Sequence, residues 1–223
     1  MLVNADFSQR AIVMPHQYQW IASPNGEVDR AMLDRLGGEN TRATSIVRYG
    51  PGASFPRHQH PGGEEILVLS GTFSEGGKHY PAGWYLRNPP GSSHAPSSAD
   101  GATIFVKLRQ MAPFDSQSVR IDTRDMNQWQ SEPNGDICLL YVNEVERVRL
   151  HRLRPSSMLP VDGAMELLIL DGDTSFEGVR YSHGTWMRLP VGDQGKILAG
   201  TAGAKLYVKS GLFERSDAEP NNA

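Results

Sequence analysis

Residues 52–71 read GASFPRHQHPGGEEILVLSG, and this stretch decides both the fold and the chemistry expected of the chain. His58 and His60 are separated by one residue, so on a strand their side chains face the same side. A Pro-Gly-Gly turn over residues 61–63 then lets the chain reverse. Glu64 opens the next strand and can face the same interior. Two imidazoles and a carboxylate that converge in this way are typical ligands of a first-row transition metal.

A fourth donor follows in GWYLRNPPGSSH, residues 83–94, where His94 comes just after a Pro-Pro-Gly turn. A histidine in that position can swing back to the same centre. Three nitrogen ligands and one oxygen ligand favour one divalent transition metal ion per chain, with iron, manganese, nickel, cobalt and zinc all open. An isolated histidine is usually a surface or hydrogen-bonded residue. A His-x-His pair followed by a carboxylate and a further histidine is much harder to explain in that way.

The composition limits the class of protein. The chain has 223 residues with Gly 23 and Pro 15, which suits two domains of about 100 residues with many turns and short strands. A formal charge of −3 without a basic cluster argues against nucleic-acid binding. No apolar run approaches the ~20 residues of a membrane span. Cys138 is the one cysteine and we identify no signal peptide, so we expect a cytoplasmic protein.

The sequence repeats itself along the chain. WIASPNGEV at residues 20–28 matches WQSEPNGDI at residues 129–137, and EEILVLSG at residues 64–71 matches MELLILDG at residues 165–172. Three turn residues of the first half also recur in the same order in the second half, namely Gly83, Pro89 and Gly91 as Gly184, Pro190 and Gly192. Landmarks that match in order along two halves of a chain predict a duplication.

We expect the first copy to span residues 1–112 and to hold the metal site, and the second copy to span residues 113–223. Short runs rich in Val, Ile, Leu and aromatic residues, separated by Gly, Pro, Asn and Asp, predict an all-β sandwich or barrel for each copy. VDRAMLDRLGG, residues 28–38, is the exception, because its apolar spacing and closing glycines favour one short helix.

The second copy lacks the metal donors of the first. In LPVDGAMELLILDG, residues 159–172, Met165 stands in the place of Glu64. Gly195 falls where His94 would be. We therefore expect a degenerate second domain without metal ligands, which serves as a packing scaffold, as a dimer surface or as an adapted pocket.

These residues resemble the cupin family. Residues 52–71 fit its first motif of Gly, five residues, His-x-His, three residues, Glu, six residues and Gly. Residues 83–94 fit the second motif of Gly, five residues, Pro-x-Gly, two residues and His, although Ser98 replaces the usual closing Asn. The resemblance implies cupin barrels (a double-stranded β-helix, or jelly roll) duplicated as a bicupin. It implies that the metal ligands are His58, His60, Glu64 and His94.

The wider sequence resembles the cupin half of ChrR anti-sigma factors and the related stand-alone cupin dioxygenases. The likeness lies in RYGPGASFPRHQHPGGEEILVLSGTF and YPAGWYLRNPPGSSHAPSS, residues 48–73 and 80–98. The dioxygenase likeness implies a metal-dependent enzyme, with Fe(II) as a candidate metal, that acts on a small diketone or ketone in the N-terminal barrel. The metal and the substrate would carry the chemistry, so no catalytic residue is assigned.

The ChrR likeness implies an alternative role as a regulator that senses an oxidant or a ligand at its metal site and releases an extracytoplasmic-function sigma factor. ChrR-type proteins bind that partner through a separate zinc module with a His-x3-Cys-x2-Cys signature. This chain has one cysteine and residues 1–50 are expected to form strands, which weakens the case for a sigma-factor partner. A non-catalytic binding barrel is a third alternative. Exposed strand edges need cover, so we expect a homodimer.

Overall fold

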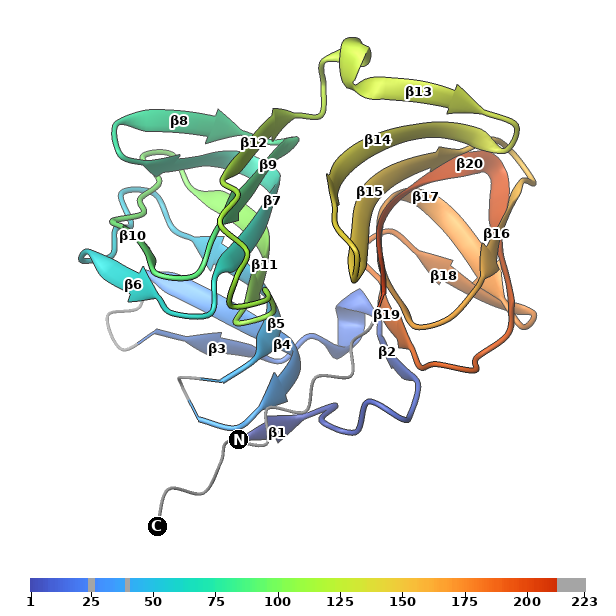
Figure 1. Ribbon diagram of the computed structural model, residues 1–223, viewed down its shortest axis with the longest axis horizontal. Coiled ribbons are helices and arrows are strands. Elements are labelled where there is room, and N and C mark those ends of the chain that lie inside the picture. The colour runs from blue at the N-terminus through green and yellow to red at the C-terminus, as the bar shows by residue number, and fades with distance from the viewer. Residues whose placement is uncertain (24–26, 39–40, 212–223) are drawn as a thin grey trace.

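The computed structural model describes residues 1–23, 27–38 and 41–211. Its 20 strands form two barrels that lie beside each other (Figure 1), joined by short turns that include the 3-10 elements η1 (Pro15–Gln17) and η2 (Met126–Gln128). The described residues contain no α-helix. The prediction of an all-β protein is therefore confirmed. No helix in this part of the chain is long and apolar enough to cross a membrane.

The first barrel is built from eleven strands. They are β1 (Leu2–Val3), β3 (Trp20–Ala22), β4 (Val28–Leu36), β5 (Ala43–Tyr49), β6 (His58–His60), β7 (Glu64–Glu75), β8 (Lys78–Pro81), β9 (Trp84–Asn88), β10 (Ser92–His94), β11 (Ala102–Leu108) and β12 (Val119–Asp122). The main sheet has the order β1-β4-β5-β11-β7-β9-β12, with β3 on β4 and β8 on β7. β6 and β10 form a separate two-stranded sheet.

The second barrel repeats this plan. Its strands are β2 (Ala11–Val13), β13 (Trp129–Glu132), β14 (Gly135–Val142), β15 (Glu146–Leu153), β16 (Met158–Val161), β17 (Met165–Phe176), β18 (Val179–Ser182), β19 (Trp186–Leu189) and β20 (Gly195–Gly211). The sheet order is β13-β14-β15-β20-β17-β19-β2, with β16 on β20 and β18 on β17.

Each barrel takes one strand from the other half of the sequence. β12 follows residue 112 in the chain but pairs with β9, where Ile121 lies opposite Tyr85. β2 lies near the N-terminus but pairs with β19, where Val13 lies opposite Trp186. The boundary at residues 112 and 113 stays a prediction, and backbone hydrogen bonds cross it in both directions.

The duplication is visible in the backbone of β7 and β17, which both run for 12 residues. Gly71 and Gly172 lie at the same point of these strands, with φ of 67° and 70°. A Cβ atom would lie 2.1 Å from a carbonyl oxygen at Gly71 and 2.3 Å from one at Gly172, so only glycine fits at either position. The Trp repeat also holds, because Arg48 lies 3.6 Å from the ring centroid of Trp20 and Arg152 lies 4.2 Å from that of Trp129. The Pro-Asn-Gly at residues 24–26 lies outside the described residues.

The short helix predicted over residues 28–38 is wrong, since β4 occupies most of this segment. β4 pairs with β5, and the register shifts between Met32 and Asp34, which leaves Leu33 as an extra residue. Such a bulge reverses the in-and-out alternation partway along a strand. The buried side chains on either side of the bulge then fall at a spacing that looks helical.

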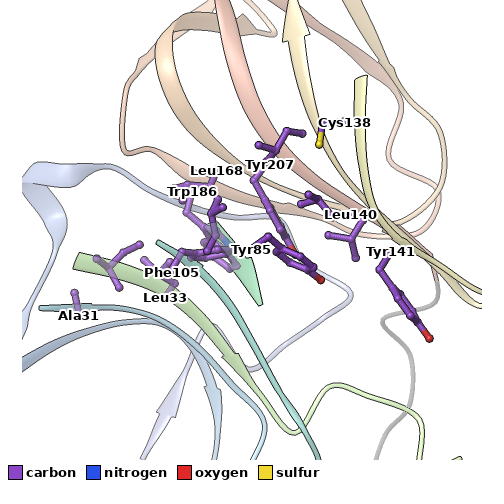
Figure 2. Packing of buried hydrophobic residues seen from close by; sticks show 14 of the residues in the cluster. Ala31, Leu33, Tyr85, Phe105, Cys138, Leu140, Tyr141, Leu168, Trp186 and Tyr207 are labelled. Carbon is purple, nitrogen blue, oxygen red and sulfur yellow. The ribbon is translucent and has the colours of Figure 1, made fainter. Parts of the chain in front are cut away.

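Three clusters of buried apolar residues form the cores of the two barrels and the contact between them. One fills the first barrel and includes Ile66 and Phe73, and another fills the second barrel and includes Leu167 and Phe176. The third lies between the barrels. Figure 2 shows it, with Tyr85 and Phe105 from the first barrel facing Leu168, Trp186 and Tyr207 from the second. The rings of Phe105 and Tyr207 pack edge to face with centroids 5.1 Å apart, which joins the two barrels through one buried core.

Candidate metal centre

The predicted ligands come from three strands of the first barrel. His58 and His60 lie on β6, Glu64 is the first residue of β7, and His94 is the last residue of β10. β6 and β10 are antiparallel, with His94 directly opposite His58 and Ser92 opposite His60. The three imidazoles therefore share one face of this two-stranded sheet. The turn between β6 and β7 is closed by the amide of Gly63, which donates to the His60 carbonyl at 3.0 Å.

The structure brings all four side chains together. Nε2 of His60 lies 2.9 Å from Nε2 of His94, and these atoms lie 3.5 Å and 3.4 Å from Oε2 of Glu64. The His58 ring centroid is 4.7 Å from that of His60 and 5.0 Å from that of His94. His58 is exposed and the other three side chains are buried, so the cluster meets solvent on the His58 side.

Two of the imidazoles are oriented by acceptors on their far nitrogens. Nδ1 of His58 lies 2.9 Å from the Pro56 carbonyl oxygen, and Nδ1 of His94 bonds to Oε2 of Glu75. A carbonyl and an ionised carboxylate accept hydrogen bonds, which assigns the proton of each ring to Nδ1 and leaves Nε2 with a lone pair. The hydrogen bonds thus present the nitrogen that faces the centre in the form that a metal requires.

Arg120 connects the two residues that support the ligands, Glu75 beside His94 and Asn88 beside Glu64. Its Nη2 donates to Oε1 of Glu75 at 2.5 Å and also to Oδ1 of Asn88. Nδ2 of Asn88 donates in turn to Oε2 of Glu64 at 3.2 Å. One guanidinium on β12 therefore positions both the carboxylate that holds His94 and the amide that holds Glu64.

Burial sets the protonation of the donors. Burial first, and then the rings of His94 and His58, lower the pKa of His60 to about 4 and keep this ring neutral. Burial raises the pKa of Glu64 to about 7. Burial alone would lower the pKa of His94, but the hydrogen bond with Glu75 and the negative charges of Glu64 and Glu75 together raise it.

The donor set fits a divalent transition metal. Two imidazole nitrogens and a carboxylate oxygen point at one another within 3.5 Å, which is unfavourable unless a proton or a cation lies among them. His58, His60 and His94 each offer a nitrogen, and these atoms all lie within 4.8 Å of one another. Imidazole and carboxylate donors suit several first-row ions, so the set does not select one metal.

The second barrel has apolar side chains at the matching positions that the structure aligns. Met165 lies opposite Leu189 in the register in which Glu64 lies opposite Asn88. The place of Glu75, at the end of β7, is taken by Phe176 at the end of β17. Gly195 lies against the ring of Phe176, since a Cβ atom there would be 2.7 Å from it. Ile12 on β2 holds the place of Arg120 and packs against the core of the second barrel.

Sequence reasoning missed Glu75, Asn88 and Arg120. The repeat carries a signal for two of them, because a polar residue in one copy is matched by Phe176 and Leu189 in the other. Arg120 gives no such signal, since its strand follows the expected boundary and the repeat used to align the copies begins at Trp129.

Residues 8–112 match the family model described as the ChrR Cupin-like domain. No curated protein matches the chain in sequence. In fold, the chain is similar to a cupin 2 conserved barrel domain protein from Leptotrichia buccalis, with a TM-score of 0.64 and 12% identity over 95% of this chain and 100% of that one.

Two further crystal structures are similar in fold. One is a candidate dioxygenase from Nostoc punctiforme, with a TM-score of 0.73 and 14% identity over 90% of this chain and 82% of that one. The other is the bacterial pirin YhhW from Escherichia coli in complex with nickel(II), with a TM-score of 0.67 and 12% identity over 90% of this chain and 98% of that one. At these identities the likeness establishes the fold alone, and it confirms the predicted pair of cupin barrels.

Proposed function

Residues 8–112 match the ChrR cupin-like domain, and from this premise we propose that the first barrel binds one divalent transition metal ion through His58, His60, Glu64 and His94. The observation that carries the proposal is the convergence of these four donors, with Nε2 of His60 and of His94 within 3.5 Å of Glu64. The match of both motifs, residues 52–71 and 83–94, to one centre supports the same ligand set.

We further propose that the centre serves a dioxygenase-type reaction on a small diketone or ketone. Iron(II) bound at such a site would supply the O2 chemistry by which a dioxygenase adds both oxygen atoms to its substrate. The resemblance in fold to the candidate dioxygenase from Nostoc punctiforme is consistent with this hypothesis. The role of the chain is to bind and orient, because the metal and the substrate carry the reaction.

An aromatic wall beside the imidazoles supports an apolar substrate. Phe55 lies 6.3 Å from His58 and Phe73 lies 6.2 Å from His94, measured between ring centroids. Tyr49 packs edge to face against both phenylalanines. A small ketone would place its carbon skeleton against such a wall, since apolar surface is removed from water there.

A regulatory role is the second candidate, and the match of residues 8–112 to the ChrR cupin-like domain favours it. Under the regulatory hypothesis, an oxidant or a ligand reaches the centre on the exposed His58 side and changes the protein's affinity for a partner. A pull-down of a cognate sigma factor under reducing and oxidising conditions tests it. The homodimer and the cytoplasmic location also stay predictions.

Metal analysis and oxygen uptake together test the enzyme. Protein is purified without oxygen from cells given no excess metal, and its metals are measured before small diketones are added with O2. We expect near-stoichiometric iron and an oxygen uptake that needs both the substrate and His94, so that it disappears in His94→Ala. Chelator-resistant zinc with no oxygen uptake would contradict the enzyme and favour the regulator.

A further inference from the structure

A pocket of about 600 Å³ lies between β8, β9, β10 and β12, next to the candidate metal centre. Its walls come from several segments, and they are lined by Arg57, Glu75, Gly76, Lys78, Tyr80, Asn88, Pro89, Ser92, Ser93, His94, Ala95, Ser118 and Arg120. His94 is the one predicted ligand among the described residues that border it. The pocket is therefore a space beside the centre and not the centre itself.

The second barrel has three ion-paired side chains at the matching positions, of which Arg10 and Glu177 are 39% and 54% exposed. Arg10 donates from Nη1 to Glu177 at 2.5 Å and from Nε to Asp193 at 2.6 Å, with further bonds from Nη2 to both carboxylates. The guanidinium carbon lies 5.0 Å from the ring centroid of Phe176. We call Arg10, Glu177 and Asp193 the plug.

Each member of the plug has a small counterpart in the first barrel. Glu177 corresponds to Gly76, because both follow a 12-residue strand and begin its turn with φ of 50° and 55°. Asp193 corresponds to Ser92, because their amides donate to Pro190 and to Pro89 at 3.2 Å and 3.0 Å.

Arg10 corresponds to Ser118. Ala11 and Val119 follow these residues and pair with Arg188 and Arg87, which hold the same place on β19 and β9. The three counterparts Gly76, Ser92 and Ser118 all line the pocket. The first barrel thus has three small residues, all lining the pocket, where the second barrel has an ion-paired cluster.

The charge of the space is reversed as well. The plug brings two carboxylates and one guanidinium, whereas the pocket is lined by Arg57, Lys78 and Arg120 with one carboxylate, Glu75. The oxygens of Glu75 are already bonded to His94 and Arg120. An anion that entered the pocket would therefore meet an excess of positive charge.

Several donors remain available to such an anion. Within the described residues the side chain of Lys78 forms no hydrogen bond or ion pair, and the side chain of Arg57 donates only to Ser93, at 2.8 Å from Nη2. The hydroxyl of Ser92 is buried without a hydrogen-bond partner in the same part of the chain. Buried polar atoms are normally paired, so an orphaned hydroxyl in a cationic pocket marks the place of a missing acceptor.

We propose that this pocket is a binding site for a small organic carboxylate. Its volume lies within the range of about 300–1,000 Å³ that small-molecule sites occupy. The carboxylate is held by Arg57 and Lys78 at the rim and by the Ser92 hydroxyl deeper in. The site does not depend on the metal or on the reaction proposed for it. It is adjacent to both, because Arg120 and Glu75 form one wall of the pocket and also hold His94.

Fluorine NMR of small probes tests the site. Trifluoroacetate, 4-fluorobenzoate and 4-fluorophenylacetate are titrated with the full chain, with 4-fluorobenzamide as the uncharged control. We expect saturable binding of at least one carboxylate and none of the amide. Refilling the pocket with Gly76→Glu, Ser92→Asp and Ser118→Arg together should abolish binding. Lys78→Gln should weaken it by about tenfold, the loss of one charge-assisted contact.

Matched controls separate the outcomes. Lys196→Gln removes an exposed cation from the second barrel and should leave binding unchanged. Each variant is also checked for an unchanged thermal midpoint. Each titration is repeated on chelator-treated protein, because a carboxylate could ligate a metal directly. Binding that survives in the refilled variant, that needs the metal, or that is missing for all three carboxylates would overturn the proposal.

Discussion

Nζ of Lys107 in the first barrel lies 2.6 Å from Oε1 of Glu166 in the second barrel, and both side chains are fully buried. The reciprocal pair also exists, since Nζ of Lys209 lies 3.2 Å from Oε2 of Glu65. Glu65 and Glu166 are the second residues of β7 and β17, and the lysines lie on β11 and β20, where each is paired with the corresponding glutamate of its own barrel. The two halves therefore meet through the same face, as the subunits of an isologous dimer do.

The first prediction concerns that buried pair. Glu166→Gln leaves the Lys107 ammonium in the core with Thr44 as a neutral partner at 3.1 Å. Breaking a buried ion pair from one side costs about 3–5 kcal/mol, so we expect a loss of this size in the free energy of unfolding, measured with urea. Adding Lys107→Met should recover most of it, because the amide introduced by Glu166→Gln still offers an oxygen to the indole N–H of Trp186, which donates to Glu166 in the parent protein.

An exposed ion pair is the control for this measurement. Asp173 bonds to Arg180 on the surface of the second barrel, where Arg180 is 78% exposed. Asp173→Asn should cost less than about 1 kcal/mol. Equal losses at Asp173 and Glu166 would show that burial of the interface pair does not matter.

The second prediction concerns the metal ligands. His58→Ala and His94→Ala should each reduce the metal content of the purified protein to a small fraction of one ion per chain, because each removes a donor from the centre. His183→Ala is the control, since this exposed histidine of the second barrel bonds to the Leu170 carbonyl. Elemental analysis reads out all three variants. A comparable loss in His183→Ala would sink the ligand assignment.

The third prediction concerns Arg120. Arg120→Leu frees both Glu75 and Asn88, so it should lower metal affinity by about 10–100-fold, as loss of a residue that orients ligands does. Arg120→Lys should retain part of the affinity, because an ammonium can reach one of the two acceptors. Competition with a chromophoric chelator measures the affinity.

Arg124 provides the matched control for Arg120. It follows the same strand and pairs with Asp122 at 2.7 Å, but it is half exposed and makes no contact with the centre among the contacts described. Arg124→Leu should leave metal affinity unchanged. If both variants bind metal as tightly as the parent protein does, the hydrogen bonds of Arg120 do not contribute to metal affinity.

The fourth prediction concerns pH. Burial raises the pKa of Glu64 to about 7, so in the metal-free protein this carboxyl is protonated below that pH and ionised above it. A metal must displace that proton, and the raised pKa of His94 adds to the competition from protons as the pH falls. Affinity should therefore fall as pH decreases below about 7. Glu64→Gln removes this titration, and chelator competition from about pH 5.5 to about pH 8.5 should show a flatter profile for the variant. An equally steep profile would assign the proton to another group.

The convergence of the four proposed ligands could be predicted because each side chain is positioned by local sequence. His58 and His60 alternate on one strand, Gly63 closes the turn that starts β7 at Glu64, and a Pro-Pro-Gly turn precedes His94. Such turns determine where a nearby side chain points, whatever the rest of the fold does. The division of the chain into short strands could also be predicted, because Gly, Pro, Asn and Asp mark the turns between them.

The supporting residues could not be found in that way. Glu75 bonds to His94 from the far end of β7, and Asn88 meets Glu64 only through the register of β7 with β9. Arg120 depends on a strand that crosses from one half of the chain to the other. The bulge at Leu33 escaped detection too, because an extra residue in a strand has no local sequence mark.

The exchange of β2 and β12 bears on how the protein is made. As the chain leaves the ribosome, β12 emerges soon after β9, so the sheet of the first barrel can be completed early. β2 emerges among the first residues but must wait for β19, near the other end of the chain. Pairing at such a long separation is slow, because a large loop must close before any contact forms. We therefore expect the last folding event during synthesis to be the docking of the N-terminal strand, which locks the two barrels together.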